Sequence, residues 1–227
     1  MTRRAFPRVL MAVFAVVTVV STGGCTAWVG YCMAKSNETV CGKSDPEWGA
    51  GTEISFYGTE FQRRFKQFGS TSWNVPVDTV IASGGPGHVT LVHKQPDFKW
   101  QMKYRVEGDA RVALAVRAEN EANITASNAY LITLADGANS STVGSITGLT
   151  KAEAAPGTGW GYQEVQVIVS GSRLVVSING KVTSDAVVNR TADGFIAVTF
   201  DPGASGTGRF YLMEARKRWC QRESPCL

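Results

Sequence analysis

The chain has 227 residues, with 23 Lys and Arg against 19 Asp and Glu, and a formal net charge of +4 at pH 7. Three of the basic residues lie in the first eight positions, and without them 20 basic residues nearly balance the 19 acids. A chain this close to neutral gives no electrostatic reason to expect nucleic acid as a partner, and its length suits a single domain with a sizeable core.

The first 24 residues have the pattern of an export signal. Residues 2–8 include three arginines, residues 9–20 form an apolar run in which Thr18 is the one hydroxyl, and small residues precede Cys25. An apolar segment of roughly a dozen residues fits signal cleavage better than a bilayer span, which needs about 20. We therefore expect residues 1–24 to be a signal peptide and the rest of the chain to act outside the cytoplasm.

Cys25 is the expected site of lipid attachment. The Gly-Gly-Cys ending resembles a bacterial lipobox, although Thr22 stands where an aliphatic residue is usual. The alternative is ordinary cleavage after Ala27, with loss of Cys25. With the lipid, the protein meets a membrane through its N-terminus and resides in the cell envelope, in the periplasm or outside the cell. Residues 2–6 also resemble a twin-arginine export signal, but a generic basic leader explains both arginines equally well.

Four cysteines remain when Cys25 is set aside, and an even number in an oxidising compartment predicts two disulfides. They are Cys32, Cys41, Cys220 and Cys226. Four cysteines permit three connectivities, among which the sequence does not choose. A zinc site is the rival interpretation, but the spacings lack a CxxC pair and no histidine is near. We expect neither a metal nor a cofactor.

A tether without periodicity occupies residues 25–51, and alternation of apolar and polar residues follows it. In residues 98–106 aromatic and aliphatic side chains alternate with polar ones, as a half-buried strand requires, and Trp100 is assigned to the core. Similar strands are predicted at 111–118, 129–135, 163–170, 173–178, 194–200 and 209–215. The polar face of 98–106 either lines a groove or meets solvent; its residues are Lys99, Gln101, Lys103 and Arg105.

Glycine and asparagine mark the turns between these strands. Residues 170–172 and 179–181 have the composition of hairpin turns, so 163–183 should form a three-stranded meander. Glycine-rich residues 83–87 are also predicted to turn, and one helical turn is possible at 60–68. Many short strands separated by turns indicate an antiparallel sandwich or barrel. The long polar segment 135–159 is the candidate binding loop.

Several stretches carry a family resemblance: residues 73–75, 80–85, 97–99, 130–136 and 169–180. In this order they resemble the 3-keto-disaccharide hydrolase-like domain of the concanavalin A-like lectin and glucanase superfamily, over about residues 56–217. The resemblance implies an all-β jelly-roll sandwich of two antiparallel sheets, which we place at 52–217, followed by a tail at 218–227. It also implies a concave face that holds a saccharide or glycoside ligand.

The family's site pattern is only partly present. Within residues 109–117 Arg117 alone matches, and Leu131 and Thr133 replace the glutamate and glutamine of a Tyr-Glu-x-Gln motif. Neither replacement can act as a general base. Asp136 matches the family, although an aspartate that opens a turn explains it equally well. We predict Arg117, Thr133 and Asp136 as substrate-binding residues and assign no catalytic residue.

Arg117 should point the same way as Arg111, Ala113 and Ala115, since alternate residues of a strand share a face. The small side chains between the two arginines would leave room for a ligand.

Aromatic side chains supply the other candidates. A tryptophan or tyrosine exposed near a strand end can stack on a sugar ring, and Trp160, Tyr162 and Trp73 occupy such positions, although core packing is the alternative for each. Trp160 is the one we predict to bind substrate.

Acidic and histidine pairs point less clearly to a site. Glu119 and Glu121 have the spacing of a glycosidase carboxylate pair, but they end a strand among asparagines, where a solvated loop is the simpler interpretation. His88 and His93 are five residues apart, which places them on opposite faces of one strand and denies them a shared metal.

Two functions therefore stay open. One is hydrolysis of a 3-keto-disaccharide or related glycoside, and the other is non-catalytic glycan binding by a lectin-like surface domain. Two carboxylates within about 5 to 10 Å on the concave face would favour the enzyme.

Overall fold

The described part of the chain is built almost entirely from β-strands. The structure, a computed structural model, describes residues 52–53, 59–76, 79–137, 140–152, 161–190 and 193–217, all within the unit Gly42–Leu227. The predicted signal peptide, the tether, all five cysteines, the tail and Trp160 lie outside these residues. Within them, no helix has both the length and the apolar character that a membrane span requires.

The strands follow one another with few interruptions. The elements are β1 (Thr52–Glu53), α3 (Thr59–Arg64), β2 (Phe65–Asn74), β3 (Thr79–Leu91), β4 (Phe98–Glu107), β5 (Arg111–Ala118), β6 (Tyr130–Asp136), the 3-10 turn η1 (Ser140–Thr142), β7 (Gln163–Ser170), β8 (Arg173–Ile178), β9 (Lys181–Val187), β10 (Phe195–Asp201) and β11 (Thr207–Lys217). β5, β7 and β8 confirm the bounds predicted from alternation, and β4, β6, β10 and β11 confirm theirs to within two residues.

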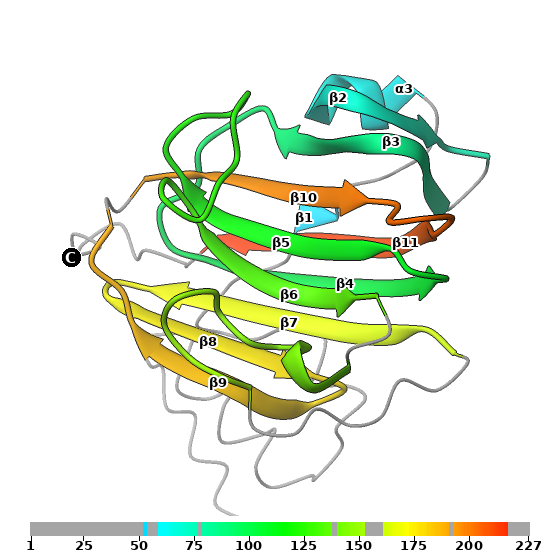
Figure 1. Cartoon of the computed structure of the whole chain (residues 1–227). Helices are drawn as coiled ribbons and strands as arrows, with labels where there is room; N and C mark the ends of the chain where they lie inside the picture. The colour runs from blue at the N-terminus through cyan, green and yellow to red at the C-terminus, as the bar shows by residue number, and fades with distance from the viewer. Residues whose placement is uncertain are drawn as a thin grey trace, which may run out of the picture. The chain divides into compact units, whose positions relative to one another are not determined.

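The strands form one antiparallel path that curls into two facing layers (Figure 1). Its order is β6-β5-β10-β3-β11-β4-β7-β8-β9. The turning point is β3, because residues 79–82 pair with β11 whereas residues 87–90 pair with β10. The first layer is therefore β6, β5, β10, the second half of β3 and the part of β2 that pairs with it, and β11, β4, β7, β8 and β9 form the second layer. This is the predicted jelly-roll sandwich of two antiparallel sheets.

Residues 83–87 lie inside β3, so the turn predicted from their glycines is wrong. Gly84 has a φ of 86°, and Gly69 in the neighbouring β2 has a φ of 87°, next to a shift in the β2–β3 register. A Cβ on Gly69 would lie 2.6 Å from the Cα of Gly87. These glycines let both strands bulge where β3 passes from one layer to the other.

Apolar side chains of both layers meet between them. Trp73 of β2 packs against Phe200 of β10 and Phe210 of β11, with ring centroids 6.4 and 6.0 Å apart. Burial raises the pKa of the Tyr104 hydroxyl, which donates to Gln163 Oε1 at 3.2 Å. The predicted core face of β4 is confirmed, because four of its side chains are at most 2% exposed: Phe98, Trp100, Met102 and Tyr104.

The meander predicted at 163–183 is confirmed as β7, β8 and β9. At its second turn Asn179 and Gly180 have φ angles of 50° and 78°, the left-handed conformations that a tight two-residue hairpin needs.

Residues 144–150 close the gap between the edges of the two layers. Ile146 bridges to Ile132 of β6. The carbonyl of Gly144 accepts hydrogen bonds from Thr183 Oγ1 at 3.2 Å and Ser184 Oγ at 2.7 Å, both on β9. The edge strands β6 and β9 are thus joined by a segment that also reaches the outer face of the first layer.

Candidate functional site

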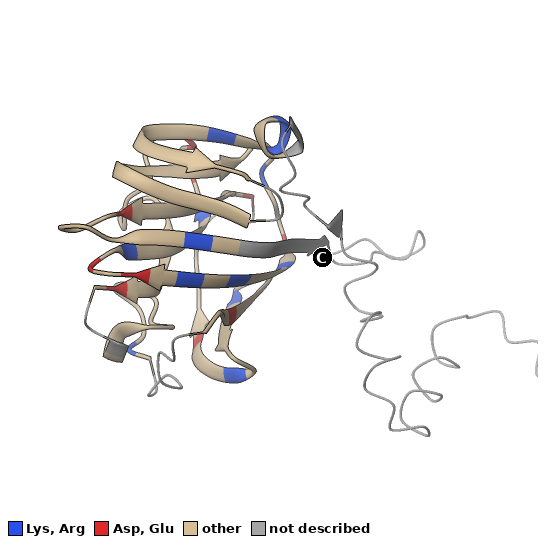
Figure 2. Cartoon of the chain, turned by 90° about the vertical axis from the view of Figure 1, so that its right-hand side faces the viewer, with Lys and Arg blue, Asp and Glu red and all other residues tan. Residues whose placement is uncertain are grey.

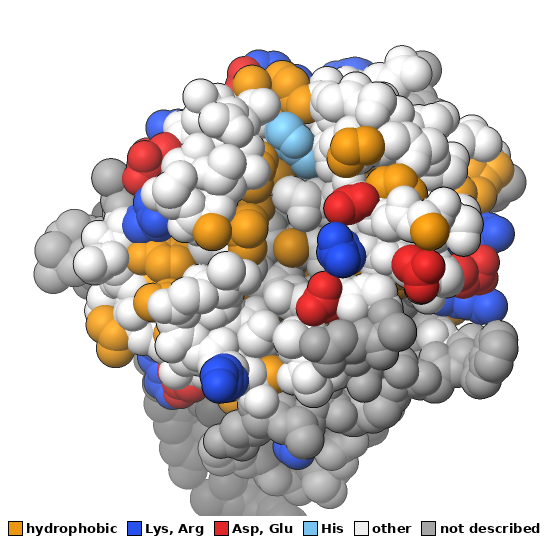
Figure 3. Space-filling view, viewed as in Figure 1, with side chains coloured by type: hydrophobic (Ala, Val, Ile, Leu, Met, Phe, Trp, Pro, Cys, Tyr) orange, Lys and Arg blue, Asp and Glu red, His pale blue; other side chains and the backbone are white. Residues whose placement is uncertain are grey.

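A groove lies on the outer face of β10, β5 and β6, which faces the viewer in Figures 1 and 3. It encloses about 420 Å³, a size that suits a small ligand. Its lining combines hydroxyl, small and charged side chains: Arg111, Val112, Ala113, Thr133, Ala135, Asp136, Thr142, Ser145, Thr147, Thr199, Phe200 and Asp201.

One end of the groove holds an arginine between two aspartates. Strand register places Arg111 of β5 opposite Asp201 of β10 on one side and Asp136 of β6 on the other. Arg111 Nε lies 3.5 Å from Asp136 Oδ1, and Arg111 Nη1 lies 3.8 Å from Asp201 Oδ2. A basic side chain flanked by two acidic ones is visible on this face in Figure 3. We call these three residues the charged triad.

The charged triad is held loosely and stays open to solvent. Its side chains are 64%, 37% and 49% exposed for Arg111, Asp136 and Asp201. Ion pairs this exposed stabilise a fold by about 1 kcal/mol or less, so the triad contributes little to the stability of the protein. Both carboxylates contact one planar guanidinium group, so their contacting oxygens lie within about 10 Å of each other.

Short side chains form the floor of the groove. Thr199 lies opposite Ala113, and Ala113 lies opposite Thr133, so the three form a row across β10, β5 and β6. Thr199 Oγ1 donates to the carbonyl of Ala113 at 3.3 Å. A row of alanine and threonine keeps the centre of the face low and lines it with hydroxyl groups.

Residues 142–147 form a wall beside β6. The backbone N–H of Thr133 donates to Ser145 O at 3.0 Å, and the N–H of Thr147 donates to Leu131 O at 2.9 Å. Thr142 Oγ1 donates to Asp136 Oδ2 at 3.2 Å, which ties the wall to the charged triad. The predicted binding loop 135–159 therefore contributes groove-lining residues in its described part, while its role in binding stays a prediction.

Residues 119–129 cover the far end of the same face. Glu121 anchors this segment, because its carbonyl accepts from Thr90 Oγ1 at 3.0 Å and its carboxylate pairs with Lys66 Nζ at 2.6 Å. Four buried alanines lie at this end of the face, with Ile124, Leu131 and Phe195 packed on them; they are Ala115, Ala118, Ala129 and Ala197. The groove is therefore confined to the end that carries the charged triad.

Glu119 and Glu121 do not form a carboxylate pair. Glu119 pairs with Arg190 Nη1 at 3.1 Å, whereas Glu121 pairs with Lys66. Each carboxylate fastens residues 119–129 to a different part of the molecule. Both residues lie in the loop that follows β5, as the sequence predicted.

Thr133 and Asp136 line the groove, whereas Arg117 does not, and the prediction that Arg117 faces it is wrong. Arg117 has a φ of 51°, which takes it out of strand alternation, and its side chain is 2% exposed. Its guanidinium donates to the carbonyls of Gly171 and Arg190 and lies 3.6 Å from Asp97 Oδ1. Burial lowers its pKa, and the charge of Asp97 opposes that shift. Arg117 is a structural link between the layers.

Aromatic side chains contribute little to the described groove. Trp73 is buried in the core, and Tyr162, although 48% exposed, is absent from the lining. Trp160 lies outside the described residues, so its binding role stays a prediction.

The polar face of β4 belongs to the second layer and faces solvent. Gln101 donates to Glu164 of β7, and Arg105 lies 2.9 Å from Glu107. Of the two alternatives for this face, the structure favours a solvated outer sheet. Figure 2 shows Lys and Arg mixed with Asp and Glu over several strands.

Arg111 and Asp201 were not predicted as site residues. Their sequence signal was weak, because each is a charged residue at the end of a strand, and only the pairing of β5 with β10 brings them together across 90 positions. Among the described residues, no group of three or more His, Cys, Asp or Glu side chains is arranged to hold a metal ion.

Comparison with known protein families identifies one whose model matches most of the chain. The model of the 3-keto-alpha-glucoside-1,2-lyase-like domain matches residues 47–213, which include every strand of both layers from β1 to β10 and most of β11. The chain belongs to this family. Comparison with curated proteins gives no match.

Solved structures share the fold at low sequence identity. An inferred glycosyl hydrolase from Parabacteroides distasonis ATCC 8503 is 14% identical with a TM-score of 0.55, over 68% of this chain and 99% of that one. Carbohydrate binding module CBM66 from Bacillus subtilis is 13% identical with a TM-score of 0.52, over 67% and 95%. The β-glucanase of Bacillus licheniformis is 9% identical with a TM-score of 0.53, over 75% and 99%. These similarities establish the jelly-roll fold.

Proposed function

We propose that the protein binds a saccharide in the groove on β10, β5 and β6. The observation that carries this proposal is the charged triad beside a floor and wall of hydroxyl side chains. Sugar hydroxyls both donate and accept, and the triad offers carboxylate acceptors from Asp136 and Asp201 next to guanidinium donors from Arg111. Thr133 adds a hydroxyl at the floor. The names of the carbohydrate-binding and glucanase structures with this fold support the same ligand class.

Calorimetric titration with a panel of neutral mono- and disaccharides and their 3-keto derivatives tests the proposal. Arg111→Met should weaken binding at least about tenfold, because each charge-assisted hydrogen bond contributes about 1.5 to 3 kcal/mol. The matched control is Arg173→Met, since Arg173 is 66% exposed and pairs with Asp185 in the second layer. If both variants bind like the unaltered chain, the triad is not the binding site.

Cleavage of a 3-keto-glycoside is a second candidate, favoured by family membership and by two carboxylates within about 10 Å in one groove. A ketone at C3 acidifies the hydrogen at C2. Asp136 or Asp201 would accept that proton, Arg111 would stabilise the enolate, and expulsion of the C1 oxygen would leave a C1=C2 double bond. The leaving oxygen takes a proton from solvent. The absence of the family's glutamate and glutamine at Leu131 and Thr133 weighs against this activity.

Ultraviolet absorption separates the two possible cleavage reactions from binding alone. Elimination from methyl 3-keto-α-glucoside creates a conjugated enone, whereas hydrolysis does not. We expect absorbance to rise with the unaltered chain and to stay flat with Asp136→Asn or Asp201→Asn, whichever is the base. No absorbance change and no free methanol at high protein concentration would leave saccharide binding as the function.

We also propose that the chain is exported and carries a lipid on Cys25, with its saccharide site in the cell envelope. The support is the leader pattern of residues 1–24. Mass spectrometry of the membrane fraction should show a mature N-terminus at Cys25 with added diacylglycerol, and Cys25→Ser should release the protein from membranes. A soluble product that begins after Ala27 would contradict the proposal.

A further inference from the structure

We propose that His88 is a ligand-contacting side chain of the groove and presents an unprotonated Nδ1 to a sugar hydroxyl. This inference rests on the proposed saccharide site and names a hydrogen-bond acceptor on it. His88 lies on β3, beside the lining residue Thr199 of β10 and just outside the residues that line the groove itself.

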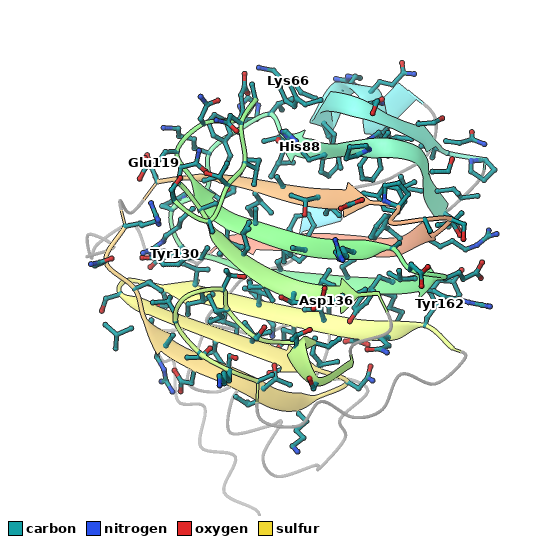
Figure 4. All side chains as sticks on the ribbon, in the orientation of Figure 1. Lys66, His88, Glu119, Tyr130, Asp136 and Tyr162 are labelled. Atoms are coloured by element: carbon teal, nitrogen blue, oxygen red, sulfur yellow. The ribbon has the colours of Figure 1, made fainter. Side chains whose placement is uncertain are left out.

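Strand register places His88 next to the floor of the groove. His88 is directly opposite Thr199 of β10, and Thr199 lines the groove. Side chains of directly opposed residues lie on the same face, with Cβ atoms about 5 Å apart. The floor row therefore continues from Thr133 through Ala113 and Thr199 to His88. Figure 4 shows His88 on the same face of the first layer as Asp136.

A backbone carbonyl sets the tautomer of the imidazole. His88 Nε2 lies 2.9 Å from the carbonyl oxygen of Glu121, which can only accept a hydrogen bond. Nε2 must therefore carry the hydrogen, so in the neutral form of the ring the lone pair is on Nδ1. Among the described residues no side chain or backbone group donates to Nδ1.

Phe68 holds the ring in place from behind. The rings of Phe68 and His88 stack with centroids 4.9 Å apart and planes at 21°. Phe68 lies on β2, on the side of β3 away from β10, so it occupies the ring face opposite the groove. The other face of the imidazole is directed away from Phe68, and Thr199 is the residue opposite His88 on β10. A ring fixed by a carbonyl at one nitrogen and by an aromatic ring at its back loses little freedom when a ligand arrives.

The placement gives the groove two chemically different borders. Along one border the charged triad both donates and accepts, and on the β3 side of Thr199 the neutral form of His88 offers an acceptor beside an aromatic surface. A saccharide that spans the floor would place a hydroxyl donor at Nδ1. The neutral acceptor would favour a hydroxyl over a carboxylate at that border, because a carboxylate has no hydrogen to donate.

Nitrogen-15 NMR of the imidazoles tests the inference directly, because the chain has two histidines and His93 serves as an internal control. In the free full-length protein, His88 should show a protonated Nε2 and an unprotonated Nδ1. Addition of methyl 3-keto-α-glucoside, or of its unoxidised parent, should move the His88 Nδ1 signal while His93 stays unchanged. A protonated Nδ1 in the neutral free ring would overturn the assignment of the acceptor.

Binding of the same two probes to His88→Ala and His93→Ala completes the test. We expect His88→Ala to lower affinity about tenfold, for the loss of one hydrogen bond and a ring contact, and His93→Ala to leave it unchanged. If the unaltered chain binds and His88→Ala binds equally, His88 is not a ligand contact while the saccharide site stands. If the unaltered chain binds neither probe nor any sugar of the panel, the saccharide site itself is refuted.

Discussion

The outer faces of the two layers differ although both follow the same alternating pattern. On β10, β5 and β6 the outward side chains near the groove are short, as at Thr199, Ala113 and Thr133. On β4 they are long, at Lys99, Gln101, Lys103 and Arg105, and Gln101 pairs with Glu164 of β7. The size of the outward side chain therefore decides which face is hollow, and a hollow face with charged residues at its rim is the one that can hold a ligand.

The arginines on the two outer faces also differ in how they are paired. Among the described residues, Arg173 on the second layer pairs with Asp185 alone, which it binds through two nitrogens. Arg111 on the groove is shared between two aspartates at 3.5 and 3.8 Å. A close, one-to-one pair is complete without a ligand, whereas the longer contacts of Arg111 leave hydrogen-bonding capacity for one.

Filling the hollow face should give the largest effect. Ala113→Trp places an indole on the floor and should weaken saccharide binding by about 100-fold or more, since the ligand must clash or leave. Lys103→Trp is the matched control, because Lys103 occupies the outer face of β4. Calorimetry with the sugar panel measures both. Equal losses of affinity for the two variants, or no loss for Ala113→Trp, would contradict the claim that the ligand binds on the outer face of β10, β5 and β6.

A variant at Arg117 should change the stability of the fold without changing its affinity for saccharide. Arg117→Met removes a buried charge from Asp97 and two backbone carbonyls, so the free energy of unfolding should fall by about 2 to 4 kcal/mol. The affinity of the folded protein for saccharide should stay within about twofold, because Arg117 does not line the groove. Urea denaturation and calorimetry give the two numbers. Unchanged stability with lost binding would restore Arg117 as a ligand residue.

A matched pair of aspartate variants probes the two arginine sites. Asp201→Asn should lower saccharide affinity several-fold, by roughly the 1 kcal/mol of one hydrogen bond. Asp185→Asn should leave affinity unchanged. Binding losses of the same size in both variants would mean that the charged triad has no special role.

The smallest expected effect is on acid stability. The hydrogen bond from Arg173 holds the pKa of Asp185 below its ordinary value. A lowered carboxyl pKa stabilises the fold above the ordinary value, and this contribution is lost as pH falls through the lowered pKa. Because the pair is exposed, Asp185→Asn should leave the acid limb of the stability curve nearly unchanged. A marked shift of the unfolding midpoint at acid pH would show that this pair is more than a surface contact.

Local sequence patterns predicted most strands of both layers, including β5, β6 and β10, but not how their side chains combine in the groove. The alternation around Trp100 and the Asn179-Gly180 turn depend on neighbouring residues alone, so both could be read from the chain. The glycines of β3 removed the alternation that identifies a strand. Arg117 kept strand spacing in the sequence, but its positive φ turned it away from the groove.

The groove itself depends on which strands become neighbours. Thr133 and Asp136 were predicted from the family resemblance, and both line it. Arg111, Asp201 and His88 were missed as a group because they come from β5, β10 and β3, and only the register across these strands brings them to one face.

A crystal structure of the protein with methyl 3-keto-α-glucoside or its unoxidised parent tests the central claim most directly. The claim predicts a sugar ring over Ala113, with hydroxyl or carbonyl oxygens within hydrogen-bond distance of Arg111 and at least one aspartate of the charged triad. A sugar bound instead on the outer face of β4, β7 and β8, with the groove left to solvent, would contradict it.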